Sequence, residues 1–218
     1  MTVNWEVGDK VLVKKGTEDA AHAVVTSLDG NRAVLSITGT IDANEQYTFK
    51  YPDTWEYIDA GQWPSYRGKK DDLKYFVKFE GTATTDAYGV FPTSPVAMEH
   101  KSFIWKLTFT KGGENITKDI VWLQVFPQTA SYSLGQYFYI HEGVTSGGED
   151  ALYYTGEGLP KETPTKMAFV AYTESGANEK CYKAERNVKN GNPFAFGKFF
   201  ASEIELETTE YTSNPYSN

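Results

Sequence analysis

The chain has 218 residues, a single cysteine and a formal net charge of -8 at neutral pH. One cysteine excludes an internal disulfide and a cysteine-built metal cluster. The acidic balance argues against nucleic acid or anionic lipid as a partner, because both need a basic surface. No apolar run is long enough to cross a bilayer. Aromatic residues make up 15% of the chain, and their abundance favours the half-buried surface of a β-sheet.

Apolar and polar residues alternate along much of the chain with the period of a β-strand. The first strands are predicted at Lys10–Val13, His22–Ser27, Ala33–Thr38 and Gln46–Lys50. Leu73, Tyr75, Val77 and Phe79 then alternate with polar residues, which predicts a strand over this segment.

The clearest alternation lies between Ser102 and Thr110, where one face would carry Phe103, Trp105, Leu107 and Phe109. Lys118 to Phe126 is apolar on both faces, which predicts a strand that is covered on both sides or lies at a domain junction. The last strands are predicted at Gln136–His141, Leu152–Thr155, Lys166–Thr173, Lys180–Arg186 and Phe196–Leu206.

Turn residues separate these segments. Asp29-Gly30-Asn31 and Lys111-Gly112-Gly113-Glu114-Asn115 predict hairpin turns, because Gly and Asn tolerate a positive φ. No segment has a convincing amphipathic helical pattern, so the sequence predicts an all-β sandwich or barrel architecture. A composition shift at residues 127–131 suggests two β-sandwich domains in tandem, covering residues 1–127 and 128–218.

The residues that usually carry chemistry are not arranged in any catalytic motif. His22, His100 and His141 lie far apart in sequence and lack a metal-binding spacing. The chain has no Gly-x-Ser-x-Gly elbow, and Glu203 and Glu205 are expected on the solvated face of the last strand. We therefore expect a non-catalytic protein with no cofactor and no metal, in which Cys181 is buried and inert.

One aromatic cluster suggests a binding site. Trp55, Tyr57, Trp63 and Tyr66 lie in a segment rich in Pro and Gly. Exposed rings on such a loop would stack on sugars, as in a carbohydrate-binding module. The alternative is that these rings cap the core at one end of a sandwich, because large rings dominate burial.

Four segments, in order, resemble the fimbrillin-like (Mfa-like) surface proteins of Bacteroidetes. The opening Trp5-Glu6-Val7-Gly8-Asp9 resembles their Trp-x-x-Gly-Asp segment, and Tyr47 to Pro52 resembles a Tyr-x-Ala-x-Tyr-Pro segment with Phe49 in place of alanine. Pro95 to His100 resembles the passage before their long amphipathic strand, and Phe196 to Phe200 resembles their closing Gly-Lys-x-Tyr strand.

This resemblance implies two transthyretin-like β-sandwich domains in a surface lipoprotein that forms fimbriae or sits at their tips or anchors. Family members carry a lipoprotein signal and a first strand before the Trp-x-x-Gly-Asp segment. The first domain here would then lack its opening strand and expose a sheet edge, and such an edge is a template for a donated strand. The chain opens without a signal-peptide pattern, which indicates either a cytoplasmic protein or removal of the signal.

The tail, Glu207 to Asn218, is mostly polar and has no alternating apolar run that would serve as a donor strand. The resemblance and this tail together predict a tip or accessory subunit that accepts a strand but does not give one. Its expected partners are other fimbrial subunits, with a host or microbial surface glycan or protein as a further possibility. The alternative function is a carbohydrate-binding module of a surface glycan system.

Overall fold

The computed structural model describes residues 4–54, 68–128, 149–157, 163–174, 179–189, 191–192 and 194–216, with residues 72, 75, 76, 156 and 157 described by their backbone alone. Nearly all regular structure in these residues is β-strand, so the predicted all-β class is confirmed. None of the described helices is long and apolar enough to span a membrane. The chain divides into two compact units: unit 1 (Met1–Trp63 and Lys74–Lys101) and unit 2 (Pro64–Leu73 and Ser102–Asn218).

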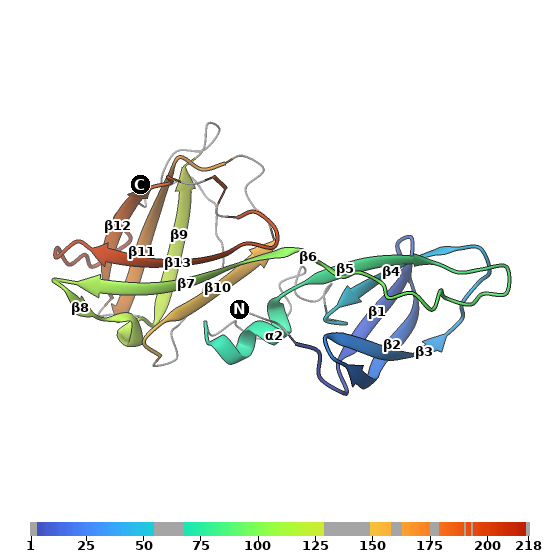
Figure 1. The fold of residues 1–218 in the computed structure, drawn as a ribbon. Helices are drawn as coiled ribbons and strands as arrows, with labels where there is room; N and C mark the ends of the chain where they lie inside the picture. Colours follow the sequence, from blue (N-terminus) through green and yellow to red (C-terminus); the bar gives the residue numbers. More distant parts are fainter. Residues whose placement is uncertain are drawn as a thin grey trace. The chain divides into compact units, whose positions relative to one another are not determined.

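Unit 1 contains one six-stranded antiparallel sheet with the order β3-β2-β1-β4-β5-β6 (Figure 1). Its strands are β1 (Lys10–Lys15), β2 (Glu18–Asp29), β3 (Arg32–Gly39), β4 (Gln46–Tyr51), β5 (Phe79–Thr84) and β6 (Glu99–His100). The predicted hairpin turn joins β2 to β3, where Asp29 pairs with Arg32 and Gly30 has a φ of +61°. Glycine adopts this left-handed conformation without a steric penalty.

The core of unit 1 lies on one face of this sheet. Every second residue of β1 and β4 is buried there, including Val11, Val13, Tyr47, Phe49 and Tyr51. The segment between β5 and β6 packs on this face through partly buried apolar side chains, Phe91, Val96 and Met98. The core is therefore closed by the sheet on one side and by this connecting segment on the other.

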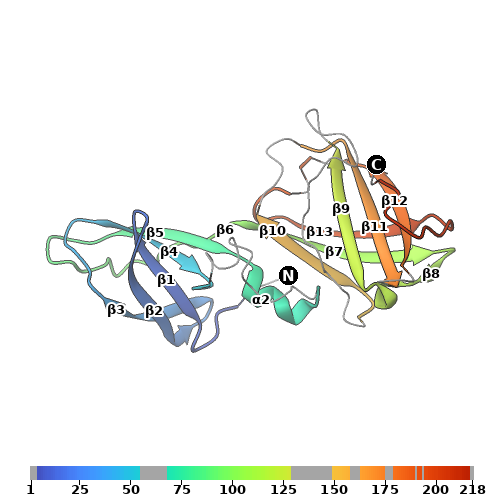
Figure 2. The same cartoon turned by 180° about the vertical axis from the view of Figure 1, so that it is seen from behind.

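Unit 2 contains two facing sheets. The first has the order β10-β7-β13, with β8 beside β7, and the second has the order β12-β11-β9 (Figure 2). Their strands are β7 (Ser102–Lys111), β8 (Glu114–Asn115), β9 (Trp122–Gln128), β10 (Leu152–Glu157), β11 (Lys166–Glu174), β12 (Lys180–Asn187) and β13 (Phe199–Leu206). β13 runs parallel to β7, whereas the other strand pairs of unit 2 are antiparallel.

Aromatic side chains fill the space between these two sheets. Phe103, Trp105, Leu107 and Phe109 are all buried, so the predicted apolar face of β7 is confirmed. The rings of Trp105 and Phe109 lie 6.2 and 6.0 Å from the ring of Phe169 in β11. These contacts join one sheet to the other and make unit 2 a β-sandwich.

The outer face of the β9–β11–β12 sheet is also covered. Phe126, Ala168, Val170, Tyr172 and Cys181 form a buried cluster on it, against which Tyr211 and Tyr216 of the tail pack. β9 is therefore covered on both faces, as its doubly apolar sequence predicted.

Two segments differ from their predicted structure. The predicted strand over Leu73 to Phe79 is wrong for its first part, because Leu73–Phe76 form the short helix α2 and β5 begins at Phe79. Leu73 and Val77 are both buried; residues four apart share one face of a helical turn, as well as one face of a strand. The start of the predicted strand at Lys118 belongs instead to the 3₁₀ turn η2 (Thr117–Asp119).

The units divide the chain at a different place from the predicted boundary between residues 127 and 128. That boundary falls inside β9, which pairs along its whole length with β11. The last change of unit along the chain lies between Lys101 and Ser102, because the long strand β7 pairs with β10 and β13 of unit 2. The predicted strand over Gln136 to His141 lies outside the described residues.

Candidate functional site

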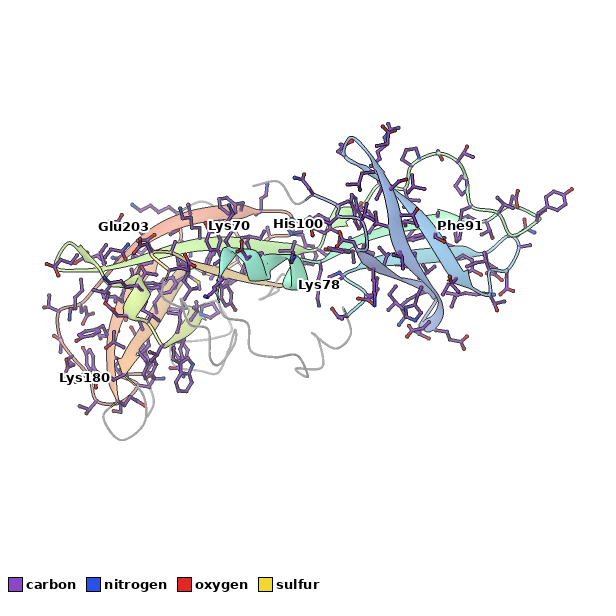
Figure 3. All side chains as sticks on the ribbon, turned by 90° about the horizontal axis from the view of Figure 1, so that it is seen from below. Lys70, Lys78, Phe91, His100, Lys180 and Glu203 are labelled. Carbon is purple, nitrogen blue, oxygen red and sulfur yellow. The ribbon has the colours of Figure 1, made fainter. Side chains whose placement is uncertain are left out.

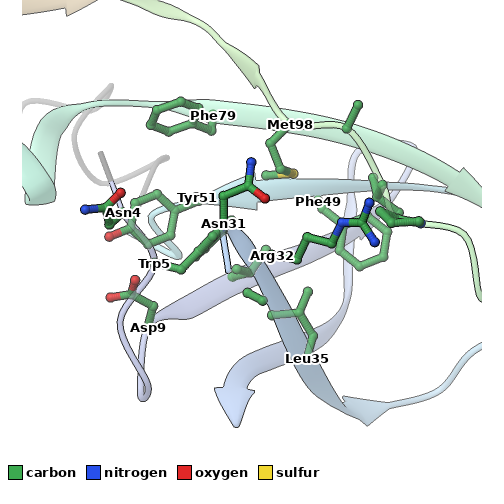
Figure 4. Close-up of a pocket in the computed structure, with 15 residues that line it drawn as sticks. Asn4, Trp5, Asp9, Asn31, Arg32, Leu35, Phe49, Tyr51, Phe79 and Met98 are labelled. Atoms are coloured by element: carbon green, nitrogen blue, oxygen red, sulfur yellow. The ribbon is translucent and has the colours of Figure 1, made fainter. Parts of the chain in front are cut away.

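An apolar groove of about 480 Å³ opens on the core face of unit 1 (Figure 4). One lip is formed by residues 31–35 at the start of β3, and the facing lip is formed by residues 95–98. The floor between the lips is mostly aromatic and aliphatic, with Trp5, Val11, Phe49, Tyr51 and Phe79. Its volume lies in the range of pockets that bind small ligands or side chains.

Gly81 in β5 positions the second lip. A Cβ atom at this position would lie 2.7 Å from the carbonyl oxygen of Ala97, 2.8 Å from Sδ of Met98 and 2.9 Å from Cγ1 of Val96. Real Cβ atoms do not approach other atoms so closely. The absence of a side chain at Gly81 therefore allows residues 96–98 to lie directly against the sheet.

The first lip is the edge strand of the sheet. β3 pairs with β2 on one side, and no strand in the described part of the chain pairs with its other side. Leu35 lines the groove, whereas its neighbour Val34 points away from the core and is 51% exposed. The groove thus adjoins a main-chain edge that the described strands leave unpaired.

Polar side chains also line the groove. Asn4, Asp9, Asn31 and Arg32 line it together with the apolar floor (Figure 4). The backbone N–H of Glu6 donates to a carboxylate oxygen of Asp9 at 2.8 Å, which ties the carboxylate to the chain beside Trp5. Arg32 supplies the positive charge among these lining residues.

Phe79 of the aromatic floor is flanked by a histidine, His100, from the neighbouring strand β6. The ring of His100 stacks on that of Phe79 at 4.7 Å, and burial lowers the pKa of this histidine below its ordinary value. His100 therefore acts as an aromatic packing partner of Phe79. Among the described residues that line the groove there is one carboxylate, Asp9, and most of the others are apolar.

The site residues expected from the sequence were Trp55, Tyr57, Trp63 and Tyr66, and all four lie outside the described residues. The groove brings together residues that sequence reasoning had not combined. A signal was nevertheless present, because Trp5, Phe49, Tyr51 and the 95–98 segment all belong to the stretches on which the family resemblance was based.

The remaining candidates for chemistry are separated or buried. In the described part of the chain, no group of three or more His, Cys, Asp or Glu side chains is placed to hold a metal ion. Cys181 is buried, as expected, and burial raises the pKa of its thiol to about 11. Glu203 and Glu205 are both exposed on β13, as predicted, and Glu203 is labelled in Figure 3.

Comparison with known proteins gives weak similarity. No protein-family model matches the chain, and no curated protein matches it. Three similar solved structures are each named "putative cell adhesion protein". The one from Bacteroides uniformis has 12% identity, coverage of 96% of this chain and 93% of its own, and a TM-score of 0.42.

The other two structures come from Bacteroides ovatus and Bacteroides eggerthii. The first has 12% identity, coverage of 96% and 87%, and a TM-score of 0.44. The second has 13% identity, coverage of 94% and 81%, and a TM-score of 0.41. Similarity at this level does not establish a shared fold, and the proposals below rest on the geometry of this chain and its sequence.

Proposed function

We propose that this protein is a non-catalytic, adhesin-type subunit of the bacterial cell surface, on the extracellular side of the outer membrane, and that unit 1 accepts a β-strand donated by another fimbrial subunit. The observation that carries the proposal is the position of the β3 edge beside the apolar groove. The ordered sequence resemblance to fimbrillin-like proteins supports the same function.

An extended segment beside β3 would use both features of the site. Its main chain would hydrogen-bond to the free edge of β3, and every second side chain would point into the groove. Each apolar side chain that becomes fully buried contributes about 1.5–3 kcal/mol. Three such side chains contribute about 5–9 kcal/mol, which is comparable to the cost of about 4–15 kcal/mol for association. We therefore expect weak binding of a free peptide and firmer binding of a strand that is held in place by a whole subunit.

Residues 207–216 are held against unit 2 and are not free to act as a donor strand in this conformation. Tyr211 and Cys181 exchange two backbone hydrogen bonds of 2.9 Å. The hydroxyl of Tyr216 donates to Glu185 at 3.0 Å, and its ring lies 5.7 Å from that of Phe126. Residues 207–216 are thus already bound to unit 2, and their release would expose the apolar cluster beneath them.

Strand acceptance can be tested with a library of eight-residue peptides, the length of β3, with apolar residues at every second position. Hydrogen exchange of the β3 amides is measured with and without each peptide. We expect some peptides to slow this exchange, and Leu35→Arg to abolish the effect because the new side chain would place a charge in the groove.

Val34→Arg is the matched control, because it introduces the same charge on the same edge strand but on the exposed face. It should retain peptide binding. Equal effects of the two variants, or a library in which no peptide slows exchange, would refute strand acceptance at this groove. Insertion of a peptide of residues 207–216 would show that this segment can serve as a donor strand once it is released from unit 2.

A further inference from the structure

A loop at one end of unit 1, residues 85–92, presents an exposed aromatic ring. Tyr88 is 90% exposed and Val90 is 58% exposed, which makes Tyr88 the most exposed large hydrophobic residue described. An isolated exposed ring needs no explanation in itself. The loop that carries Tyr88, however, is fixed by hydrogen bonds and packing, so the ring is held in an exposed position.

The backbone on both sides of Tyr88 is fixed by Asp86. One carboxylate oxygen of Asp86 accepts hydrogen bonds from the backbone N–H of Tyr88 at 2.8 Å and from that of Val90 at 2.9 Å. The N–H of Asp86 donates to the carbonyl of Val90 at 2.9 Å. Gly89 completes the turn with a φ of +74°, a conformation that side-chain-bearing residues seldom adopt.

Both ends of the loop are anchored in unit 1. At one end the buried hydroxyl of Thr85 donates to the carbonyl of Asp42 at 2.7 Å and accepts from the N–H of Glu45 at 3.1 Å. At the other end the ring of Phe91, which is labelled in Figure 3, packs edge-to-face on two rings of the core. Its centroid lies 5.4 Å from that of Tyr47 and 5.3 Å from that of Phe49. The projecting ring therefore sits on a loop that loses little backbone entropy when a partner binds.

The neighbouring loop, residues 40–45, carries fixed polar groups. Lys15 forms ion pairs with Asp42 at 2.9 Å and with Glu45 at 3.1 Å, and the N–H of Asn44 donates to the carbonyl of Asp86 at 2.9 Å. The contacts of these two loops thus involve three carboxylates and one ammonium group. The local charge is negative, which disfavours an anionic partner.

We propose that the Tyr88 loop binds a neutral sugar ring of a glycan. A protein interface of ordinary size buries about 800 Å² on each partner and has an apolar centre, whereas this loop offers one ring and one valine among charged groups. A pyranose has an apolar face of C–H groups and a rim of hydroxyls. The apolar face would stack on the exposed ring of Tyr88, and the hydroxyls would donate to the carboxylates of this end of unit 1.

This proposal deepens the adhesin-type function and rests on its surface role, but it does not depend on strand acceptance at the groove. A site of this size has low affinity for one sugar, so the test uses biotin-labelled protein clustered on streptavidin, which raises the apparent affinity through multivalency. The probe is an array of immobilised neutral and sialylated oligosaccharides.

We expect binding to neutral oligosaccharides and none to their sialylated forms. Tyr88→Ala should reduce the bound signal by about tenfold or more, as the loss of a central aromatic contact does, whereas Tyr88→Phe should stay close to the parent protein because the ring remains. Phe196→Ala removes an exposed ring of unit 2 and is the matched control. Its signal should not change.

The two proposals fail in different ways. Leu35→Arg should abolish peptide capture at the groove and leave glycan binding intact. The glycan proposal is overturned if the clustered protein binds no neutral oligosaccharide above background. It is also overturned if Tyr88→Ala and Phe196→Ala give the same signal as the parent protein.

Discussion

Gly81→Ala is expected to destabilise unit 1, although the same substitution in an ordinary strand would stabilise it. Gly81 lies in β5 opposite Phe49, and its φ is not in the left-handed region. The backbone therefore accepts alanine. The steric clash comes from the second lip of the groove, because the added methyl group would lie 2.7–2.9 Å from atoms of residues 96–98.

Two opposing effects decide how much Gly81→Ala changes the free energy of unfolding of unit 1. Replacing glycine by alanine in a strand contributes about 0.5–1 kcal/mol of stability, since the unfolded chain loses freedom. Overpacking against a close neighbour costs about 1–3 kcal/mol. One of the contacts is to a backbone oxygen, which moves only if the lip moves, so we expect the cost to prevail. The net loss should be about 0.5–2 kcal/mol.

Hydrogen exchange of the β4 and β5 amides reports this change in unit 1 alone, without interference from the unfolding of unit 2. Thr82→Ala is the control, because Thr82 is the next residue of β5 and is exposed. It should change exchange little, whereas Gly81→Ala should speed it up by about two- to thirtyfold. Unchanged or slower exchange in Gly81→Ala would show that residues 96–98 do not lie against the sheet, and would remove one lip of the groove.

Two further predictions concern unit 2. Burial raises the pKa of the Cys181 thiol to about 11, and the thiol donates to the carbonyl of Ser213 at 3.4 Å. We therefore expect no reaction with an aromatic disulfide reagent near pH 8 until the protein unfolds. Fast reaction of the folded protein would contradict the coverage of Cys181 by the tail. The side-chain hydrogen bond from Lys166 holds the pKa of Glu185 below its ordinary value. Because the folded-state pKa is the depressed one, the resulting stability is present at neutral pH and is lost as the pH falls below about 5. Lys166→Met should therefore make the denaturant midpoint of unit 2 less dependent on pH between neutral and acidic conditions, and an unchanged dependence would refute this role of the ion pair.

The strands were predictable because their signal is local. In β7, Phe103, Trp105, Leu107 and Phe109 alternate with smaller or polar residues over a single segment, and any fold that buries this face must extend the chain. Gly112 and Gly113 likewise allow the tight β7–β8 turn with positive φ angles of 60° and 84°. Such features depend on neighbouring residues alone.

The short helix at Leu73–Phe76 shows the limit of this signal. Alternation over Leu73, Tyr75 and Val77 is compatible with a strand, and the spacing of Leu73 and Val77 is equally compatible with a helical turn. Which of these forms depends on where each side chain is buried, and that is decided by distant segments. The same holds for the start of β9, where η2 is held by Thr117, whose hydroxyl accepts the N–H of Phe109 at 2.7 Å.

The candidate sites were less accessible to sequence reasoning than the fold. The groove combines the 31–35 lip with the 95–98 lip, which are some sixty residues apart in sequence, and Gly81 gives no hint in the sequence that it accommodates the second lip. Tyr88 is one of 15 tyrosines, and nothing in its local sequence separates an exposed, anchored ring from a buried one.

The sequence alone determined that this chain is built from β-strands, that no disulfide holds it together, and that its tail is too polar to alternate as a strand. Composition and local periodicity carry these properties, because they follow from each residue's own side chain and its nearest neighbours. The tertiary structure decided that residues 31–35 and 95–98 face each other across a groove, that β13 lies parallel to β7, and that the tail covers the outer face of β11. These features arise from pairing and packing between distant segments, whose free energies depend on the assembled core and not on any single stretch of chain.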